Sequence, residues 1–280
     1  MSATIMDGKR LAADIKSGIA ETVFYMERKP TLAVVLVGDD PASALYVRSK
    51  ARDCADCGIL CRDHHLPAEV SQEALLALVR KLNADEAVDG ILVQLPLPRG
   101  LNAEEVLCAI DPDKDVDGFH PFNVGRLWQG QSIYAPCTPA GIMALLREYH
   151  IDPAGKSCVV IGRSSIVGKP MAALLLQANG TVTMCHSRTE NLRDICRQAD
   201  ILVSAAGCLG LVTADMVKPG AAVVDVSMNH DARGRLCGDT DFAAVAERAA
   251  YITPTPGGVG PMTRAMLLVN TLTAARRRGK

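Results

Sequence analysis

The sequence predicts an α/β protein of two lobes, each built on a largely parallel sheet covered by helices. Short β-branched runs alternate with amphipathic stretches along the chain, which is typical of parallel strands joined by helical crossovers. A length of 280 residues exceeds the usual size of a single domain. In the second half, a glycine turn follows an apolar run, as in nucleotide-binding sheets.

In the first half, hydrophobic periodicity and capping residues indicate three helices and three strands. We expect helices over about 8–26, after Pro41 and from the cap residue Ser71, and strands over 31–37, near 59 and over 88–93. From Leu95 to Pro139 the segment is rich in proline, and we expect loops to dominate it. Such a segment is too long for an ordinary connection, so it is either functional or a crossing between lobes.

The second half repeats a strand-and-helix alternation. We expect strands over 158–161, 181–185, 201–204 and 221–226, and a final helix over 261–277 that returns to the first lobe. These elements resemble a Rossmann-type nucleotide-binding sheet. The expected division is residues 1–139 plus 263–280 for one lobe and residues 140–262 for the other.

Composition and charge argue against several classes of partner. The net charge is -1 and only 4% of residues are aromatic, so we expect no nucleic-acid partner. The basic run from Arg276 is interpreted as the solvated last turn of a helix. No apolar stretch is long enough to span a bilayer, and acidic residues at 7, 14 and 21 argue against a targeting peptide. We expect no membrane partner and a cytoplasmic location.

The ten cysteines are scattered, which favours reduced, packed thiols over a disulfide framework. Cys54 and Cys57 form a CxxC without a second pair, so we expect no metal there. Acidic residues at 113, 115 and 117 resemble the start of a calcium loop. However, Val124 stands where a bidentate Glu belongs and Pro121 interrupts the loop, so calcium is not expected.

A candidate dinucleotide turn joins the apolar run Val159–Ile161 to a helix through Gly162 and Gly168. A turn of this kind exposes backbone N–H groups to an anion, and diphosphate is the natural ligand. The pattern is not GxGxxG, so on its own it supports cofactor binding only in part. A phosphate-binding NTPase loop is disfavoured, because five residues separate the glycines instead of four and Pro170 replaces the magnesium-binding hydroxyl.

The residues after the next strand indicate which dinucleotide binds. NAD sites usually carry an acid there for the ribose hydroxyls, whereas this chain has His186, Ser187 and Arg188. Arg163 adds a cation in the first turn. Cations and a hydroxyl suit a ribose phosphate, so the residues favour NADP over NAD.

A second candidate site lies after the strand ending at Val37. Tyr46 and Lys50 are four residues apart on one face of the expected helix, and Gln94 follows another strand. All three lie beyond carboxyl ends of strands, the edge at which parallel sheets bind ligands. From spacing alone, a surface lysine beside an amphipathic tyrosine remains an equal alternative.

Several motifs taken together closely resemble the bifunctional methylenetetrahydrofolate dehydrogenase/cyclohydrolase family, and the resemblance covers most of the chain. Besides Tyr46 with Lys50 and the Gly162-Arg163-Ser164 turn, they are the runs Gln94–Pro98, Asp113–Gly118, Pro136–Pro139 and Pro256–Thr263. The resemblance implies NADP-dependent oxidation of 5,10-methylenetetrahydrofolate, hydrolysis of the methenyl product to 10-formyltetrahydrofolate, and a homodimer.

The resemblance also implies roles for individual residues. Lys50, Gln94 and Tyr46 are the expected catalytic residues: a lysine kept partly neutral would not repel the developing cation and would assist attack by water, with Gln94 orienting it. Asp117 is expected to grip the pterin edge. The expected folate-binding residues are Tyr46, Lys50, Gln94, Leu95, Pro96, Asp117, Gly257 and Gly258. The expected cofactor-binding residues are Thr138, Gly162, Arg163, Ser164, Val167, Gly168, His186, Ser187 and Arg188.

The chain departs from the family pattern at Ser227, Met228, Thr240 and Thr255, so the cofactor loops are the least determined part of the prediction. Two other functions stay open. One is an NADP-dependent dehydrogenase of another small substrate, which would leave Asp117 and the Gln94–Pro98 run unexplained. The other is a catalytically silent folate-binding protein, which would be expected to lack Lys50 or Gln94.

Overall fold

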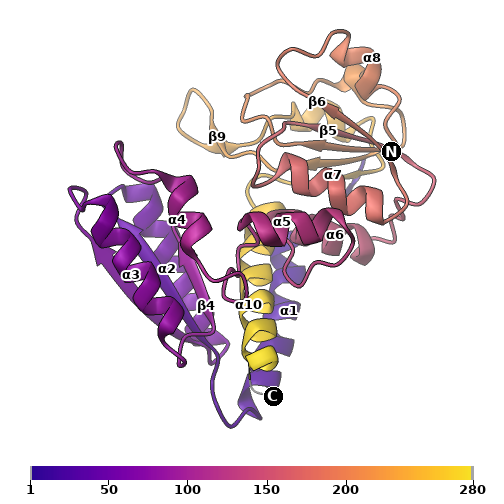
Figure 1. The fold of residues 1–280 in the computed structure, drawn as a ribbon. Coiled ribbons are helices and arrows are strands. Elements are labelled where there is room, and N and C mark those ends of the chain that lie inside the picture. Colours follow the sequence, from indigo (N-terminus) through magenta and orange to yellow (C-terminus); the bar gives the residue numbers. More distant parts are fainter. Residues whose placement is uncertain (1, 279–280) are drawn as a thin grey trace. The chain divides into compact units, whose positions relative to one another are not determined.

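The computed structural model describes residues 2–278, and the chain divides into two compact units (Figure 1). Unit 1 comprises residues 2–12 and 136–263, and unit 2 comprises residues 13–135 and 264–278. The boundaries fall inside helix α1 (Gly8–Phe24) and helix α10 (Val259–Arg278). The predicted α/β class with two lobes is confirmed, including the return of the C-terminal helix to the unit that holds the first-half strands.

Unit 1 is built on a six-stranded, entirely parallel sheet. The strand order is β1-β11-β8-β7-β5-β6. The strands are β1 Thr4–Ile5, β5 Ser157–Ile161, β6 Thr181–Cys185, β7 Ile201–Ser204, β8 Ala222–Asp225 and β11 Tyr251–Ile252. Because β6 and β7 lie on opposite sides of β5, the strand order reverses at β5, which is the point where doubly wound sheets bind ligands.

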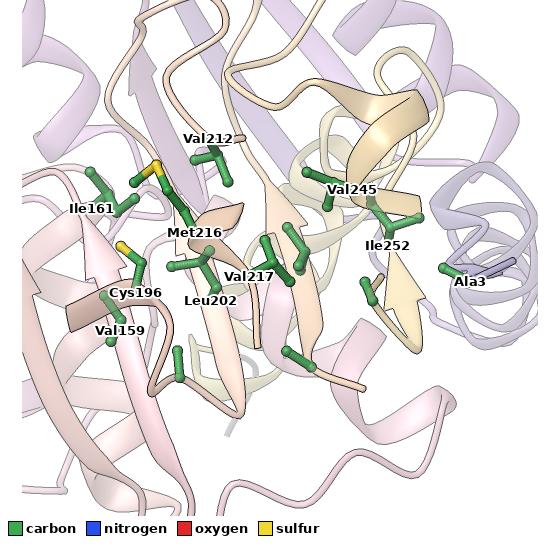
Figure 2. Close-up of a cluster of buried hydrophobic side chains, with 14 of the residues drawn as sticks. Ala3, Val159, Ile161, Cys196, Leu202, Val212, Met216, Val217, Val245 and Ile252 are labelled. Atoms are coloured by element: carbon green, nitrogen blue, oxygen red, sulfur yellow. The ribbon is translucent and has the colours of Figure 1, made fainter. Parts of the chain in front are cut away.

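Short helices and one hairpin complete unit 1. The helices are α6 Cys137–Glu148, α7 Gly168–Gln177, α8 Leu192–Cys196, the 3-10 turn η1 Ala214–Met216 and α9 Phe242–Ala246. The hairpin pairs β9 Asn229–His230 with β10 Leu236–Cys237. Figure 2 shows part of the unit 1 core, where Leu202 lies near Met216 and Val245 lies beside Ile252. Each fully buried side chain of this kind contributes roughly 1.5–3 kcal/mol.

The N-terminal segment differs from the expected division of the chain. We expected residues 1–139 to form one lobe, but β1 extends the unit 1 sheet by pairing in parallel with β11. Ala3 N–H donates to the Ala246 carbonyl, and Ala3 is buried in the unit 1 core. A two-residue strand carries too little periodicity to be predicted, since its assignment depends on a partner far along the chain.

Unit 2 holds a three-stranded parallel sheet of order β3-β2-β4. Its strands are β2 Thr31–Val37, β3 Leu60–Leu66 and β4 Gly90–Val93. Its remaining helices are α2 Pro41–Asp56, α3 Gln72–Ala84, α4 Ala103–Ala109 and α5 Pro121–Trp128. Every residue of β2 is buried, as expected for a central parallel strand, and α3 and α4 pack on the face bearing Val35 and Ile91.

Loops take up most of the segment from Leu95 to Pro139, as expected, but α4, α5 and the start of α6 also lie in it and were not predicted. Asn102 caps α4 by accepting from Glu105 N–H. Pro121 occupies the first turn of α5 after the cap residue His120. Proline is compatible with that position, because the first N–H groups of a helix have no intrahelical acceptor.

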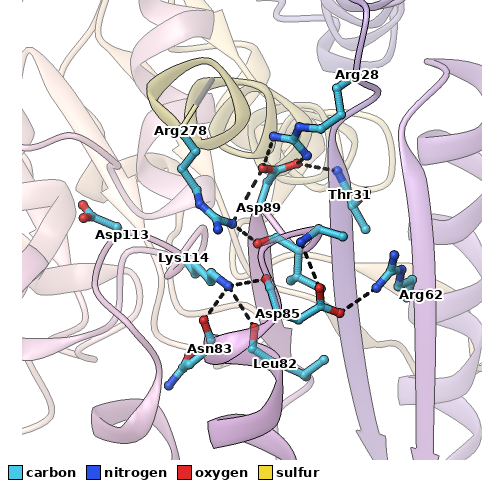
Figure 3. A network of polar contacts seen from close by, with 12 residues as sticks. Arg28, Thr31, Arg62, Leu82, Asn83, Asp85, Asp89, Asp113, Lys114 and Arg278 are labelled. Atoms are coloured by element: carbon cyan, nitrogen blue, oxygen red, sulfur yellow. Dashed lines mark hydrogen bonds and ion pairs between the residues drawn. The ribbon is translucent and has the colours of Figure 1, made fainter. Parts of the chain in front are cut away.

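Buried charges anchor the amino-terminal edge of the unit 2 sheet (Figure 3). Asp89 is fully buried and accepts from Arg28 at 2.9 and 2.6 Å and from Thr31 N–H at 2.9 Å. The Arg28 guanidinium is paired bidentately, and the hydrogen bonds to Asp89 raise the pKa of Arg28. These contacts fix the start of β2 against the residue preceding β4.

Candidate active site

The lysine site of unit 2 begins with the turn from β2 into α2. Asp40 caps the helix by accepting from Ser43 N–H at 2.8 Å, and Pro41 follows at the first helical position. Tyr46 and Lys50 then lie one turn apart. The Lys50 amine lies 5.1 Å from the centre of the Tyr46 ring, within range of a cation–π contact.

The structure joins Lys50 to Gln94. Lys50 Nζ donates to Gln94 Oε1 at 2.9 Å, and Lys50 is only 7% exposed. Gln94 Nε2 donates to the Leu95 carbonyl at 2.6 Å, which fixes the amide so that its oxygen faces the amine. The alternative of a surface lysine is therefore excluded. Leu95 and Pro96 continue from Gln94, half-buried and exposed respectively.

Asp117 follows a segment that is attached to β4 of the unit 2 sheet. The segment before it forms a parallel bridge between Asp115 and Ile91, and Ile91 N–H donates to the Lys114 carbonyl at 2.8 Å. Asp117 then lies in a turn, which is closed by the hydrogen bond from Gly118 N–H to the Asp115 carbonyl at 3.1 Å. Asp117 is half-buried. The amine and the amide thus meet at the carboxyl ends of β2 and β4, and the segment before Asp117 is attached to β4.

The neighbours of Asp117 in its motif have structural contacts. Asp115 is 1% exposed and accepts from Phe119 N–H, His120 N–H and Asn123 Nδ2 at 3.2, 2.8 and 2.8 Å. Its carboxylate holds the turn that follows Asp117, so it is engaged inside the protein and no calcium-loop geometry forms.

Lys114 anchors the same segment from the other side (Figure 3). Its buried amine donates to the carbonyls of Leu82, Asn83 and Asp85 at 2.9, 2.7 and 2.8 Å, which closes the end of α3. Burial lowers the pKa of Lys114. Asn270 of α10 also donates to the Val116 carbonyl at 2.8 Å.

Sequence reasoning missed Asp53, which follows Lys50 by three residues on α2. It is 4% exposed and lies 2.8 Å from Lys16 Nζ and 3.0 Å from an Arg264 guanidinium nitrogen. The pair of cations ties α1 and α10 to the helix that carries Lys50. The spacing of Tyr46, Lys50 and Asp53 at helical intervals was the available signal.

A cavity of about 390 Å³ lies at the carboxyl ends of β5, β6 and β7 in unit 1. It is lined by Ile161, Gly162, Arg163, Ser164, His186, Ser187, Leu192, Ala205, Ala206, Cys208 and Leu211. The structure thus brings together five of the predicted cofactor residues, at 162–164 and 186–187, at the strand-order reversal. This is the position expected for a dinucleotide in a doubly wound sheet.

The glycine turn is required by close backbone packing. Gly162 has φ 118°, and a Cβ there would lie 2.4 Å from the Ala205 carbonyl oxygen. A Cβ on Gly168 would lie 2.2 Å from the Gly162 carbonyl oxygen. Larger residues at either position would therefore force the strand, the helix and the loop after β7 apart.

The N–H groups at the end of this turn have acceptors within the chain, whereas those earlier in the turn remain a predicted anion contact. Ser164 Oγ accepts from Val167 N–H at 3.2 Å and Gly168 N–H at 3.3 Å, and the Ser164 carbonyl accepts from Lys169 N–H. The chain itself caps α7. Hydroxyl capping satisfies the orphan donors that an anion would otherwise contact.

Four predicted cofactor residues lie outside the cavity lining. Arg188 is exposed, and its N–H donates to His186 Nδ1 at 3.2 Å. Val167 precedes α7, with Gly168 as the first helical residue. Thr138 Oγ1 lies 2.9 Å from Thr263 Oγ1.

Gly257 and Gly258 pack against the start of α1 within unit 1. The Gly257 carbonyl accepts from Lys9 N–H at 2.9 Å, and a Cβ on Gly258 would lie 2.6 Å from the Pro254 carbonyl oxygen. A tight turn therefore accounts for both glycines. Their expected approach to ligands stays a prediction.

The cavity residues that follow β7 could not be identified from the sequence. Ala205, Ala206, Cys208 and Leu211 form a wall of the cavity, and Leu192 of α8 adds to it. Small and apolar residues carry no chemical signature by themselves. The N–H groups of Ala206 and Cys208 donate to Asp239, more than thirty residues later in the chain, so their position depends on the folded unit.

The cysteine pair shows no features of a reactive site. Cys54 and Cys57 are buried free thiols, and burial raises the pKa of Cys57 to about 11. Within residues 2–278, no group of three or more His, Cys, Asp or Glu side chains is arranged to hold a metal ion. None of the helices described over this range is both long and apolar enough to cross a membrane.

Two family models match the chain. The first, for the tetrahydrofolate dehydrogenase/cyclohydrolase catalytic domain, matches residues 6–117. The second, for the tetrahydrofolate dehydrogenase/cyclohydrolase NAD(P)-binding domain, matches residues 136–279. The matched segments carry the lysine site and the cavity, respectively.

Relatives and solved structures agree with the family models. The bifunctional protein FolD of Streptococcus pneumoniae is 55% identical over 277 residues, covering 98% of this chain and 97% of its own length. The crystal structure of the Campylobacter jejuni bifunctional enzyme FolD, a methylenetetrahydrofolate dehydrogenase/cyclohydrolase, is 50% identical with a TM-score of 0.98, covering 99% of this chain and all of its own. The Trypanosoma brucei FolD complexed with NADP cofactor and inhibitor is 42% identical with a TM-score of 0.95, covering 100% of this chain and 99% of its own.

Proposed function

Because the chain belongs to the tetrahydrofolate dehydrogenase/cyclohydrolase family, we propose that it catalyses both reactions in sequence. In the first, 5,10-methylenetetrahydrofolate loses a hydride to NADP and becomes the 5,10-methenyl cation. In the second, water attacks this cation, and loss of a proton gives 10-formyltetrahydrofolate.

The observation that carries the proposal is the buried hydrogen bond from Lys50 Nζ to Gln94 Oε1. A long cationic side chain is normally solvated. The burial of Lys50 against the Gln94 amide and the Tyr46 ring therefore indicates a functional role. A silent folate-binding protein would not require the amine. A dehydrogenase of another small substrate would leave Asp117 without a role.

Each polar group of this edge has a step in the proposed chemistry. The Lys50 amine assists attack of water on the methenyl carbon by holding and moving a proton, and Gln94 and the Tyr46 ring keep the amine in place. Asp117 grips the amino-pyrimidine edge of the pterin through two parallel hydrogen bonds. These residue roles are part of the proposal.

The unit 1 cavity fits one half of a dinucleotide cofactor. Its walls are a glycine turn, apolar side chains suited to a flat ring, and polar groups from Arg163, His186 and Ser187. No carboxylate is among its lining residues, so a ribose phosphate meets a cation and a hydroxyl, which favours NADP. When bound, the cofactor accepts the hydride.

The test is an absorbance assay on the purified chain. With 5,10-methylenetetrahydrofolate and NADP, we expect methenyl product and NADPH to form, and the methenyl absorbance then to decay as water opens the ring. NAD replaces NADP in a parallel reaction. Formation of NADPH without subsequent methenyl decay would contradict the cyclohydrolase half, and no reaction with either cofactor would contradict the whole.

From the family resemblance we also propose that the chain forms a homodimer and works in the cytoplasm. Light scattering coupled to gel filtration is expected to give about twice the 29.7 kDa chain mass. Cell fractionation is expected to recover the activity in the soluble fraction. A monomeric mass at assay concentration would contradict the first statement.

A further inference from the structure

The cavity wall after β7 is held from behind by side chains of a distant segment. Ala206 N–H and Cys208 N–H donate to the Asp239 carboxylate at 3.0 and 2.7 Å. Gly207 N–H donates to Ser227 Oγ at 3.0 Å. Three consecutive backbone N–H groups of the wall therefore point away from the cavity, into the interior of unit 1.

Asp239 is a fully buried carboxylate that these contacts satisfy. Besides the two backbone donors, it accepts from Ser204 Oγ and Ser227 Oγ, each at 2.7 Å, and from Asn229 Nδ2 at 3.0 Å. Five donors around one buried carboxylate fix its position strongly, since a buried charge is tolerated only when it is well paired. The hydrogen-bonded carboxylate is thus a rigid support.

Ser227 differs from the other donors because it bridges the carboxylate and the wall. Its hydroxyl donates to Asp239 Oδ2 and accepts from Gly207 N–H. Ser204 donates to the same oxygen at the same distance but has no contact with the N–H groups at 206–208. A hydroxyl that donates and accepts at once transmits the position of one partner to the other.

The wall is in contact with the glycine turn, which also lines the cavity. The Ala205 carbonyl would lie 2.4 Å from a Cβ on Gly162, so no gap separates them. Any displacement of residues 205–208 therefore changes the cavity that contains Arg163 and His186. Because the N–H groups at 206–208 are all used inside unit 1, this part of the wall acts through its shape.

We propose that Ser227, held by Asp239, is a positioning residue that sets the shape of the cofactor cavity and hence the affinity for NADP. The inference rests on the proposed function for the identity of the cofactor. It extends that function by assigning a role to a position where the chain departs from the family pattern.

The test compares Ser227→Ala with Ser204→Ala. Both variants remove one 2.7 Å hydrogen bond to the same carboxylate oxygen, but only the first releases Gly207 N–H. We expect Ser227→Ala to raise the Kd and KM for NADP about tenfold, with the dehydrogenase kcat retained at saturating cofactor. Ser204→Ala is expected to change the Kd by less than about threefold.

Hydrolysis of added methenyltetrahydrofolate is the internal control, because it consumes water and no cofactor. Both variants are expected to keep this rate, which a general loss of folding would lower. Wild-type affinity in Ser227→Ala, equal losses in both variants, or a parallel loss of hydrolysis would each overturn the inference. Titration of NADP alone tests it separately from the proposed reactions: a wild type that binds NADP but turns over neither folate would contradict the proposed function only.

Discussion

In both units a buried carboxylate accepts backbone N–H groups of a loop, but the sequence separation between the carboxylate and the loop differs. In unit 2, Asp115 accepts backbone N–H groups four and five residues later and holds the turn after Asp117. In unit 1, Asp239 accepts from N–H groups 33 and 31 residues earlier. The carboxylate and its loop are therefore neighbours in the sequence in unit 2 but distant in the sequence in unit 1.

The groups that face the ligands also differ between the units. The unit 2 edge presents a buried amine paired with an amide, whereas the unit 1 cavity presents backbone, small side chains and half-buried or exposed polar groups. Burial strengthens electrostatic effects and solvent screens them. Changes in unit 2 should therefore alter the chemistry, and changes in unit 1 should alter affinity.

The largest expected effect tests the chemical half of this comparison. Lys50→Met keeps the length and apolar stem of the side chain but removes the amine that donates to Gln94. We expect hydrolysis of methenyltetrahydrofolate to fall by roughly 10²–10⁴-fold, the range typical of a positioned acid or base. NADP affinity, measured by titration, should stay unchanged.

Lys81→Met is the matched control, because Lys81 is exposed on α3. It should hydrolyse the substrate at the wild-type rate. Normal hydrolysis by Lys50→Met would show that Lys50 is not catalytic. Loss of NADP affinity in Lys50→Met would show that a change in unit 2 does not alter the chemistry alone.

The next effect concerns stability and the segment that carries Asp117. Lys114→Met leaves three carbonyls at the end of α3 without their buried donor. We expect the free energy of unfolding to fall by about 2–4 kcal/mol, because unsatisfied buried polar groups are costly. Urea unfolding measures the loss, and Lys81→Met on the same helix should change stability by less than about 0.5 kcal/mol. A loss no larger than that of the control would show that Lys114 is not an anchor.

The comparison also explains how far the sequence determined the site. Tyr46, Lys50 and Gln94 could be placed at one strand-end edge, because helical spacing and the strand-end rule are local patterns. Their catalytic role came from the family resemblance, since spacing alone left a surface lysine open. The Asp239 support could not be predicted, since its donors come from separate strands and loops that only the folded sheet brings together.

Local patterns also predicted the long strands of the fold better than its short helices. Parallel strands such as β2 and β5 have long apolar runs and were predicted closely. The short helices α4 and α5 were missed because proline was weighed as a helix breaker, although Pro121 stands in a first turn where it is tolerated. The cap residue Asn102 with Glu105 was the signal for α4.

A smaller effect is expected from the cofactor cations of unit 1. Arg163 lines the cavity, whereas Arg188 is exposed beyond it. We expect Arg163→Ala to weaken NADP about tenfold while changing NAD by less than about threefold, because one charge-assisted contact to a phosphate is lost. Arg188→Ala should affect NADP less than Arg163→Ala. Equal losses of NADP and NAD affinity in Arg163→Ala would remove the argument for a ribose-phosphate contact.

The smallest expected effect separates Asp239 from a second buried carboxylate of unit 1, Asp225. Asp225 accepts from Thr240 N–H and Thr240 Oγ1 at 2.8 Å each and from Ser227 N–H at 3.1 Å. Burial raises the pKa of Asp225, so its contribution to stability is fully present below about pH 3.8 and is lost as the pH rises through its folded value. Asp239 is also desolvated, but its many hydrogen bonds outweigh burial and lower its pKa. Its contribution is present above about pH 3.8 and is lost as the pH falls.

Asp225→Asn and Asp239→Asn should therefore change the pH dependence of the free energy of unfolding between pH 3 and 7 in opposite directions. Urea unfolding across this range measures the difference of each variant from the wild type. That difference should grow toward low pH for Asp225→Asn and shrink for Asp239→Asn. If both differences shrank toward low pH, folding would lower the pKa of Asp225 as it lowers that of Asp239, and the expected contrast between the two carboxylates would be wrong.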